Sequence, residues 1–450
     1  MAQRALAQFS PGRLILLALF ATIAVGALLL ALPLARTVPM APIDIIFTST
    51  SVTCVTGLFT VPIEHFTFFG HCVILVLMQI GGLGLITLML FVWSLLSNMG
   101  LATQLMAGQL LEIESWKNIK KIIIFIISVT TIIEACGALV LYFVQPVAQL
   151  PVHRLFCALF HSVSAFCSTG ISIFGNNLVG FANHGSFLLI TALLMLIGGL
   201  GFITIYELLY HWASVRAHKR HHLSLQCRLV LAGTLAAILT GTVLIWMLEH
   251  ENSFAPLGAM STVINSVFHA ISCRSTGFIT VNVTEFQLAT LFLFMVISFI
   301  GSAPGSTGSG IKLTTLAVYI ATVKAAITGT QSVNIGSRQI AKEQVNKAIA
   351  IVALSFLWII LTTFCLLITE ARFTFLDIFF ESVTAFSNLG LSTGITGHLT
   401  TMGKLFIMFS MIAGRIGSLT LILALRKIAL RRTAQQTQEF SYPQERIMLS

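Results

Sequence analysis

Four glycines recur along the 450-residue chain, and each ends a stretch that is rich in serine and threonine. Gly57, Gly170, Gly277 and Gly390 lie 113, 107 and 113 residues apart, and an apolar residue follows each of them. Glycine takes positive φ angles at little cost, so such a stretch can turn successive carbonyl oxygens the same way. Four of these stretches around one axis would replace the hydration shell of a cation. The residues therefore predict a cation-conducting pore.

A second marker follows each glycine 24 to 28 residues later. The chain reads GGLGLIT from Gly81, GGLGFIT from Gly198, GSAPGST from Gly301 and GRIGSLT from Gly414. A single glycine of this kind could simply form a turn between two hairpin helices. Two markers that keep their register four times indicate instead an internal repeat. Each unit is expected to contain a helix, a re-entrant segment and a second helix.

The composition of the chain indicates whether these units fold in a membrane or in water. Hydrophobic residues make up 56% of the chain and charged residues only 9%, with a mean hydropathy of +0.95, whereas soluble domains carry about 25% charged residues. An integral membrane protein is therefore predicted, and its excess of cations favours basic cytoplasmic loops over a nucleic-acid surface. The eight cysteines include no CxxC pair, which disfavours a zinc site. A membrane-embedded enzyme or a haem protein is disfavoured, because the apolar segments contain no pairs of acidic residues or histidines at helical spacing.

The apolar segments define the expected elements. Helices near residues 14–34, 119–144, 229–248 and 347–369 open the four units, and segments near 69–96, 185–210, 286–328 and 403–426 close them. The predicted fold is all-α, with four-fold pseudosymmetry, eight spanning helices and four short pore helices. Its units cover residues 1–100, 101–215, 216–330 and 331–430, followed by a tail at 431–450. Only the third closing helix is expected to be broken, by an intramembrane loop, whereas the other three are expected to run unbroken through their markers.

The cations predict the orientation of the chain in the bilayer. Nineteen of the 25 lysines and arginines lie in the N-terminal segment, the loops between units and the tail. The positive-inside rule therefore places both termini in the cytoplasm and the re-entrant segments outside. The first apolar segment is long enough to span a bilayer, so we interpret it as a retained helix rather than a signal peptide.

Several motifs resemble a known family. VTCVTGL, RSTGF, FIGSAPGSTGSGIK, NLGLSTGIT and GRIGSLTL resemble the membrane subunit of Ktr-type potassium uptake systems, in the Trk/Ktr/HKT superfamily. The resemblance covers nearly the whole chain. It implies potassium uptake, often aided by sodium, across the bacterial cytoplasmic (inner) membrane. In this superfamily a glycine in all four repeats accompanies potassium, and a serine in the first accompanies sodium preference. A sodium-selective or non-selective monovalent cation transporter of the same superfamily remains the alternative.

The resemblance also implies partners and cofactors. It predicts a homodimer and a cytosolic ring of RCK-domain regulatory subunits that bind ATP or ADP. Nucleotide is expected only on that partner. No covalently bound cofactor and no nucleic acid are expected, and potassium, with sodium as a further candidate, is the transported ion rather than a resident metal.

The resemblance assigns a selectivity filter to four segments, which are called filter segments one to four below. Backbone carbonyls of these segments would hold potassium. The residues are Thr53, Cys54, Val55, Thr56 and Gly57; Phe166, Cys167, Ser168, Thr169 and Gly170; Cys273, Arg274, Ser275, Thr276 and Gly277; and Phe386, Ser387, Asn388, Leu389 and Gly390. The third segment departs most from the others, because its Phe-His pair lies one residue nearer the glycine.

The segment GSAPGSTGSGIK looks like a phosphate-binding loop. However, Ile311 separates Gly310 from Lys312, and no βαβ context surrounds it. The repeat register instead places this segment just below the filter, where small residues suit a movable plug. The predicted gate consists of Gly301, Ser302, Ala303, Pro304, Gly305, Ser306, Thr307, Gly308, Ser309, Gly310 and Lys312, together with Arg415. Arg415 could act as an electrostatic barrier, as a hydrogen-bond partner of the loop, or as a purely structural pair.

Other polar residues within apolar stretches leave alternatives open. Arg274 could brace the filter from behind or reach the outer surface. Glu134 could bind sodium or a proton, or could be a hydrogen-bonded structural residue. Glu381, His161 and His269 are expected to brace pore helices, and Glu381 with Asp377 could add negative potential at the outer mouth. The run HKRHH at 218–222 could bind a metal, but a basic inner loop is the simpler interpretation.

Overall fold

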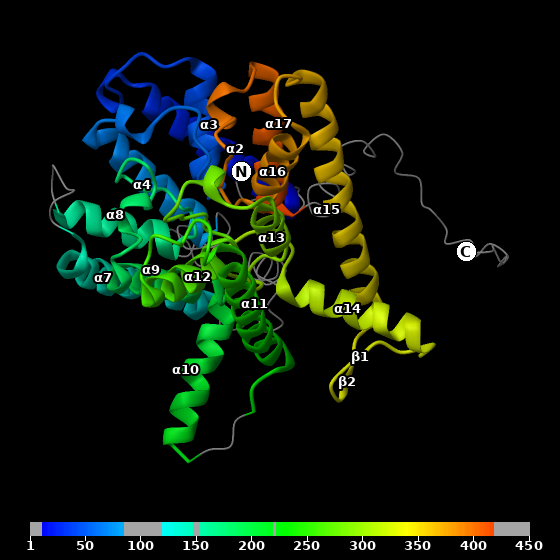
Figure 1. Cartoon of the computed structure of the whole chain (residues 1–450). Helices are drawn as coiled ribbons and strands as arrows, with labels where there is room; N and C mark the ends of the chain where they lie inside the picture. Colours follow the sequence, from blue (N-terminus) through cyan, green and yellow to red (C-terminus); the bar gives the residue numbers. More distant parts are fainter. Residues whose placement is uncertain (1–10, 85–118, 147–153, 219–221, 418–450) are drawn as a thin grey trace, which may run out of the picture.

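A computed structural model describes residues 11–84, 119–146, 154–218 and 222–417. Nearly all of the regular structure in these residues is helical, as Figure 1 shows. Three described helices are long and apolar enough to cross a membrane, namely Lys121–Val144, Leu225–Glu249 and Lys342–Thr369. A fourth span is formed if Gly185–Gly199 and Phe202–Arg216 count as one. The predicted total of eight spanning helices stays a prediction.

The elements are grouped here by the predicted units, whose boundaries also stay a prediction. The first group contains α2 (Pro11–Ala31), η1 (Pro33–Ala35), α3 (Pro42–Thr53), η2 (Ile63–His65) and α4 (Phe68–Leu83). The second contains α7 (Ile119–Val144), α8 (Arg154–Phe166), η5 (Val179–Phe181), α9 (Gly185–Gly199) and α10 (Phe202–Arg216). The third contains α11 (Leu225–Glu249), α12 (Ala259–Ser272), η6 (Val283–Glu285), α13 (Leu288–Phe299) and α14 (Leu313–Thr328). The fourth contains β1 (Asn334–Ile335), β2 (Arg338–Gln339), α15 (Lys342–Thr369), α16 (Phe375–Ser387), η7 (Thr396–His398) and α17 (Thr401–Ile416).

Helices of successive groups pack in a cyclic order. A short helix precedes each filter segment: α3, α8, α12 and α16. The closing helix of each group contacts the short helix of the next, through the pairs α4 with α8, α9 with α12, α13 with α16 and α17 with α3. The last pair joins the two ends of the described chain, and in Figure 1 the blue α3 and the orange α17 lie near each other. The chain therefore closes on itself around the filter segments.

The closing helices do not run unbroken through their glycine markers, so that expectation is wrong. Helix α4 ends at Leu83, α9 at Gly199 and α17 at Ile416. The last glycine of each marker, Gly84, Gly201 or Gly417, has a φ of 81°, 85° or 88°. These angles lie outside the helical region, which is why a glycine there ends a helix. At Gly201 the axis turns by 97° between α9 and α10.

The third closing segment is interrupted over a longer stretch than the others. Helix α13 ends at Phe299 and α14 begins at Leu313, so residues 300–312 form an irregular loop between them. Pro304 stands in the marker where the other units carry the helix-ending glycine. Proline has a fixed negative φ and cannot take the positive φ of the helix-ending glycines, so the third closing segment is interrupted in a different way.

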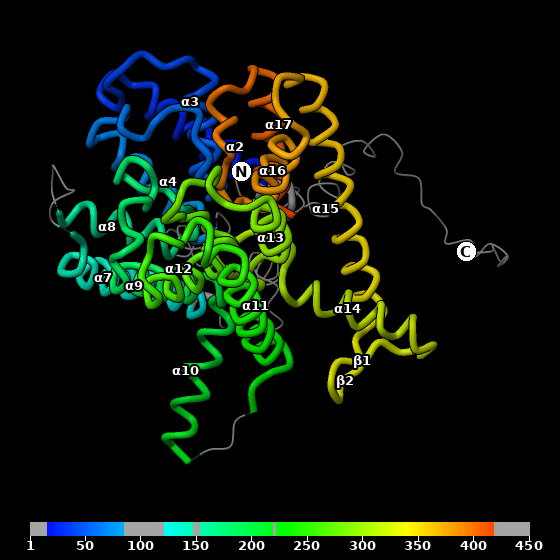
Figure 2. The backbone as a smooth tube through the Cα atoms, in the orientation of Figure 1, coloured from blue at the N-terminus to red at the C-terminus, as the bar shows by residue number. Residues whose placement is uncertain are grey.

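A small hairpin departs from the all-α expectation. Strands β1 and β2 pair antiparallel, with Asn334 opposite Gln339 and Ile335 opposite Arg338. Gly336 supplies the turn with a φ of 60°. Strands of two residues carry no alternating pattern from which a sequence could reveal them. In the tube of Figure 2 this hairpin lies beside α14, and α10 extends away from the remaining helices.

Apolar side chains cover the outward faces of the long helices. On α11, Leu235, Leu239 and Val243 are more than half exposed, at 59%, 57% and 54%. An exposed apolar stripe of this kind faces lipid in a membrane protein, where no hydrophobic gain would follow from burying it. Most polar side chains of the short helices, in contrast, are buried.

Candidate functional site: a ring of four glycine segments

The four glycines of the filter segments lie in a closed ring. All have positive φ angles, of 87°, 69°, 82° and 78° in chain order. A Cβ atom added to any of them would lie closer than 3.0 Å to the carbonyl oxygen that precedes the glycine of the next segment. The pairs are Gly57 with Thr169, Gly170 with Thr276, Gly277 with Leu389, and Gly390 with Thr56. The predicted filter residues are thus brought together, each backbone in contact with the next.

Three of the four segments share a second strained position. Val55, Ser168 and Asn388 lie two residues before their glycines and have φ angles of 60°, 59° and 53°. A left-handed conformation costs a non-glycine residue about 1–2 kcal/mol, so the surrounding contacts must hold it in place. The equivalent Ser275 is not among the residues with positive φ. The third segment therefore differs in conformation, as its sequence suggested.

The shorter third segment explains this difference. In the first segment the amide of Thr56 donates to the carbonyl of Ser51 at 2.8 Å, five residues back, and the second and fourth segments do the same. In the third segment Thr276 and Gly277 both donate to Ser272, at 2.8 and 3.1 Å. The carbonyl that accepts from the residue before the glycine is therefore one residue closer to that glycine in the third segment, and no left-handed residue is needed to reach the ring.

Asn388 connects the fourth segment to the first. Its side-chain amide donates to the carbonyl of Cys54 at 3.0 Å, to Oγ1 of Thr56 at 2.8 Å and to the carbonyl of Met411 at 3.2 Å. Asparagine is one of the few residues that tolerate a left-handed backbone. Asn388 therefore meets the backbone requirement and holds two segments that are far apart in the sequence.

The predicted gate lies against the filter segments. Within the loop, Thr307 Oγ1 donates to the carbonyl of Phe166 at 2.9 Å and lies 3.1 Å from Ser168 Oγ. Ser302 Oγ donates to Ser275 Oγ at 3.1 Å. The loop is thus bonded to the second and third filter segments, and the side chains of Ser302 and Thr307 are almost fully buried.

Backbone bonds hold the same loop against the break in the second closing helix. The amides of Ala303 and Thr307 donate to the carbonyls of Gly199 and Gly198, at 3.1 and 3.2 Å. These carbonyls are left over where α9 ends, because the carbonyls of the last turn of a helix have no N–H donors within the helix. The two helix breaks therefore satisfy each other, as irregular backbone at membrane depth requires.

Arg415 bridges the loop and the first group of helices. Its Nη1 donates to the carbonyl of Thr307 at 2.6 Å and to Ser309 Oγ at 3.1 Å, and its Nη2 donates to the carbonyl of Gly81. Arg415 is thus a hydrogen-bond partner of the loop, which is one of the three roles that the sequence left open. Its contact with α4 could not be inferred from the sequence. Lys312 Nζ donates to the loop's own Gly308 carbonyl at 2.7 Å.

The side chain of Arg274 is buried rather than at the outer surface. It is only 4% exposed, and its Nη2 reaches Thr234 Oγ1 in α11 at 3.5 Å. The guanidinium therefore extends away from the ring towards the helix that opens its own group. This position disfavours the interpretation that Arg274 reaches the outer surface, and bracing of the filter stays a prediction.

Glu381, His161 and His269 are buried at the short helices. Glu381 is 0% exposed and accepts from Thr396 Oγ1. His161 Nε2 lies 3.0 Å from Thr191 Oγ1, and the amide of Thr280 donates to His269 Nε2 at 3.4 Å. These contacts tie the short helices to neighbouring segments, and the bracing role stays a prediction. Because Glu381 is buried, it does not belong to a solvent-facing rim.

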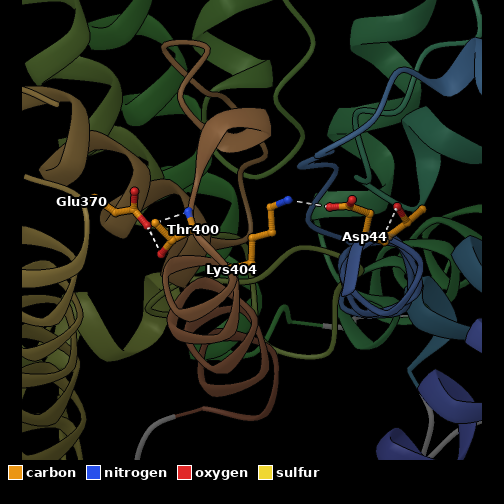
Figure 3. Close-up of polar contacts among 5 residues, drawn as sticks. Asp44, Glu370, Thr400 and Lys404 are labelled. Carbon is orange, nitrogen blue, oxygen red and sulfur yellow. Dashed lines mark hydrogen bonds and ion pairs between the residues drawn. The ribbon is translucent and has the colours of Figure 1, made fainter. Parts of the chain in front are cut away.

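An ion pair links the first and fourth groups near the helix starts. Lys404 Nζ of α17 lies 2.7 Å from Asp44 Oδ1 at the start of α3. Figure 3 shows this ion pair joining the two helices. Their side chains are only 11% and 14% exposed. Beside it, Glu370 accepts from the amide of Thr400 at 2.8 Å and so caps α17. The sequence interpretation missed Glu370, whose only signal was an acid directly after an apolar segment.

Some sequence predictions fall where the structure gives no test. Residues 219–221 of the HKRHH run, residues 85–118 and the tail lie outside the described residues. Within the described residues, no group of three or more His, Cys, Asp or Glu side chains could hold a metal ion.

Comparisons with known proteins agree with this arrangement. The TrkH family model, described as a cation transport protein, matches residues 22–431. Ktr system potassium uptake protein B of Bacillus subtilis (strain 168) is 34% identical over 427 residues, covering 93% of this chain and 94% of that protein. The potassium/sodium uptake protein NtpJ of Enterococcus hirae is 28% identical over 458 residues, covering 100% and 99%. The crystal structure of the potassium transporter TrkH from Vibrio parahaemolyticus matches with a TM-score of 0.69 and 18% identity, over 86% of this chain and 79% of that chain, which shows a shared fold.

Proposed function

The chain belongs to the TrkH family of cation transport proteins, and from this we propose that it takes up potassium through the ring of filter segments. The observation that carries the proposal is the closed cycle of glycines and neighbouring carbonyls. Removing a cation from water without a replacement shell would cost tens of kcal/mol. A ring of backbone oxygens supplies such a shell, and only glycine leaves room for it at the four positions.

The cyclic contacts support a four-unit architecture about one axis. In this proposal each unit contributes one opening helix, one pore helix and filter segment, and one closing helix. The order α4 with α8, α9 with α12, α13 with α16 and α17 with α3 is what a four-fold pseudosymmetric pore requires. Because the segments differ in sequence and conformation, the ring has lower symmetry than four identical subunits would give.

The transported ion is driven by the membrane potential in this proposal. An inside-negative potential supplies about 2.3 kcal/mol per elementary charge and 100 mV, so no hydrolysis by this chain is needed. The family resemblance favours a bacterial inner membrane, and the cation distribution favours both termini in the cytoplasm.

The loop at 300–312 acts as the gate in this proposal. It touches the second and third filter segments through Thr307 and Ser302, and Arg415 ties it to α4. Movement of the loop would break these hydrogen bonds and the backbone bonds from Ala303 and Thr307 to the carbonyls of Gly199 and Gly198. A positive side chain that close to the ring would also repel a cation until the loop moves.

A partner subunit is expected to bias this gate. Relatives are named as parts of a Ktr system, and we extend the resemblance to a homodimer and a cytosolic RCK-domain ring that carries ATP or ADP. Sodium dependence is the second candidate property, because the Enterococcus hirae relative is named a potassium/sodium uptake protein.

Ion flux into liposomes tests the proposal directly. The full chain would be reconstituted, and potassium and sodium uptake would be measured separately at a fixed potential, with protein-free liposomes as a control. Potassium uptake that exceeds sodium uptake is expected. Sodium uptake equal to or above potassium uptake would favour the sodium-selective or non-selective alternative. No cation uptake by folded protein, with or without its regulatory subunit, would overturn the proposal.

A further inference from the structure

A buried polar group lies behind the second filter segment. Glu134 of α7 is 5% exposed, and its Oε2 accepts from Gln79 Nε2 of α4 at 2.9 Å. Its Oε1 lies 3.6 Å from the Sγ of Cys167, which can donate its thiol proton, and that Sγ is 3.9 Å from Gln79 Oε1. Glu134 and Gln79 therefore connect the second and first groups of helices to Cys167, whose backbone belongs to the second filter segment.

The positions equivalent to Glu134 in the first and third opening helices, and those equivalent to Gln79 in the other three closing segments, are apolar. Gly26, Gly137 and Gly241 mark one register, since a Cβ on each would meet the adjacent short helix and the closing helix of the same unit. Three residues before these glycines stand Ile23, Glu134 and Ile238. Two residues before the second marker stand Gln79, Leu196, Phe299 and Ile412. Among these positions, the Glu134 carboxyl and the Gln79 amide thus occur together at one place, on the two sides of Cys167.

Helix packing does not explain the carboxyl group. Ser162 Oγ of α8 donates to the backbone carbonyl of Glu134 at 2.8 Å. In the first unit Ser49 Oγ donates in the same way to the carbonyl of Ile23, at 2.7 Å. The same contact therefore forms with an isoleucine, and the Glu134 side chain is free for another role. A carboxyl group at membrane depth is costly and is usually kept for function.

We propose that Glu134 and Gln79 form a brace that positions the second filter segment and thereby sets the preference for potassium over sodium. The brace acts through Cys167, whose Cβ and Sγ lie against Gly82 of α4. With Glu134 in place, Cys167 is held from two sides, and its carbonyl keeps the direction that the wider potassium ion requires. Glu134 and Gln79 are positioning residues, and this inference rests on the proposed cation-conducting function.

A double-variant experiment separates positioning from stability. Glu134→Ile and Gln79→Leu each leave the other polar group buried without its partner, whereas the double variant removes both and restores the residues found in other units. Loss of one partner costs more than loss of both. The melting temperature should therefore fall in each single variant and recover in the double variant.

The ratio of potassium to sodium permeability should not recover. We expect the double variant to show a ratio about fivefold lower than that of the original chain, as for the loss of one hydrogen bond. A matched control is Glu207→Leu, since Glu207 also accepts two bonds, from the amide and hydroxyl of Ser224, away from the filter. That control should lower stability and leave the ratio unchanged.

The outcomes distinguish this proposal from the function on which it rests. Gly57→Ala would be measured in the same liposomes as a test of the filter itself. If Gly57→Ala changes the permeability ratio and the double variant does not, the brace is wrong and the filter stands. If neither changes it, the proposed conduction path is wrong as well. A ratio lowered equally by Glu207→Leu would also overturn the brace.

Discussion

Replacing Gly57 by alanine is expected to reduce potassium selectivity through one identifiable carbonyl group. At a φ of 87° the new Cβ would meet the carbonyl oxygen of Thr169 at a distance that real Cβ atoms essentially never show. That oxygen belongs to the backbone of the second filter segment and cannot rotate away like a side-chain end. Either Thr169 or residue 57 must shift, and one oxygen then leaves the ring.

Gly394 offers a matched control for the backbone effect. Its φ is 99°, and a Cβ added there would have nothing within 4 Å. Both alanine substitutions therefore carry the cost of a positive φ, about 1–2 kcal/mol. Only Gly57→Ala disturbs a neighbouring carbonyl. Any difference between the two variants consequently reports on the ring and not on backbone strain.

The expected loss of selectivity follows from the removal of one carbonyl oxygen from the shell around the ion. A hydrogen bond to a charged group contributes about 1.5–3 kcal/mol, and we take a displaced ion–carbonyl contact to be similar. Each 1.4 kcal/mol corresponds to a factor of ten, so selectivity for potassium should fall between about tenfold and about a hundredfold. Gly394→Ala should retain the original selectivity.

Two assays check this prediction. Growth of a bacterium that lacks its own potassium uptake would be compared at low potassium, and permeability ratios would be measured in liposomes with equal amounts of folded protein. Equal growth and equal ratios for Gly57→Ala and Gly394→Ala would refute the assignment of Thr169 and Gly57 to the ion path.

Three further predictions test the neighbouring contacts. Arg415→Gln should raise potassium leak through the isolated protein roughly tenfold, because the loop loses its charged tie to α4; an unchanged leak in liposome flux assays would contradict a gating role. Asn388→Gly keeps the left-handed backbone but removes the bond to Cys54, so potassium selectivity should fall about fivefold, and unaltered permeability ratios would count against this link. Lys404→Met should destabilise the protein by about 2 kcal/mol, since it leaves Asp44 unpaired, and adding Asp44→Asn should restore much of the melting temperature; if the double variant melts no higher than the single one, the pair does not act as described.

Local sequence predicted the special backbone conformation at the four glycines, whereas the assignment of these segments as a filter stays a prediction. Serine and threonine followed by glycine at constant intervals indicated four segments with special backbone angles, and all four glycines do have positive φ. The departure of the third segment was also visible, because a one-residue difference in spacing changes how a helix end reaches a fixed point. These features depend on residues that are close together in the chain.

Helix breaks at Gly84, Gly201 and Gly417 could not be predicted with the same rules. A glycine inside an apolar segment costs a helix only about 1 kcal/mol, so the sequence is compatible with a continuous span. The break occurs at Gly201 because the carbonyls of Gly198 and Gly199 find donors in the loop from another unit. Such partners lie about a hundred residues away in the chain.

The sequence by itself determined that the chain is a membrane protein and predicted its repeated glycine segments, because hydropathy and glycine spacing are properties of short segments. Only the tertiary structure decided which carbonyl lies beside which glycine, that Arg415 reaches both the loop and Gly81, and that Glu134 meets Gln79 behind Cys167. These contacts join different helices, and their geometry depends on how whole helices pack. The spacing of the glycines predicts which residues are equivalent, whereas the packing of the four filter segments into a ring fixes which residues touch.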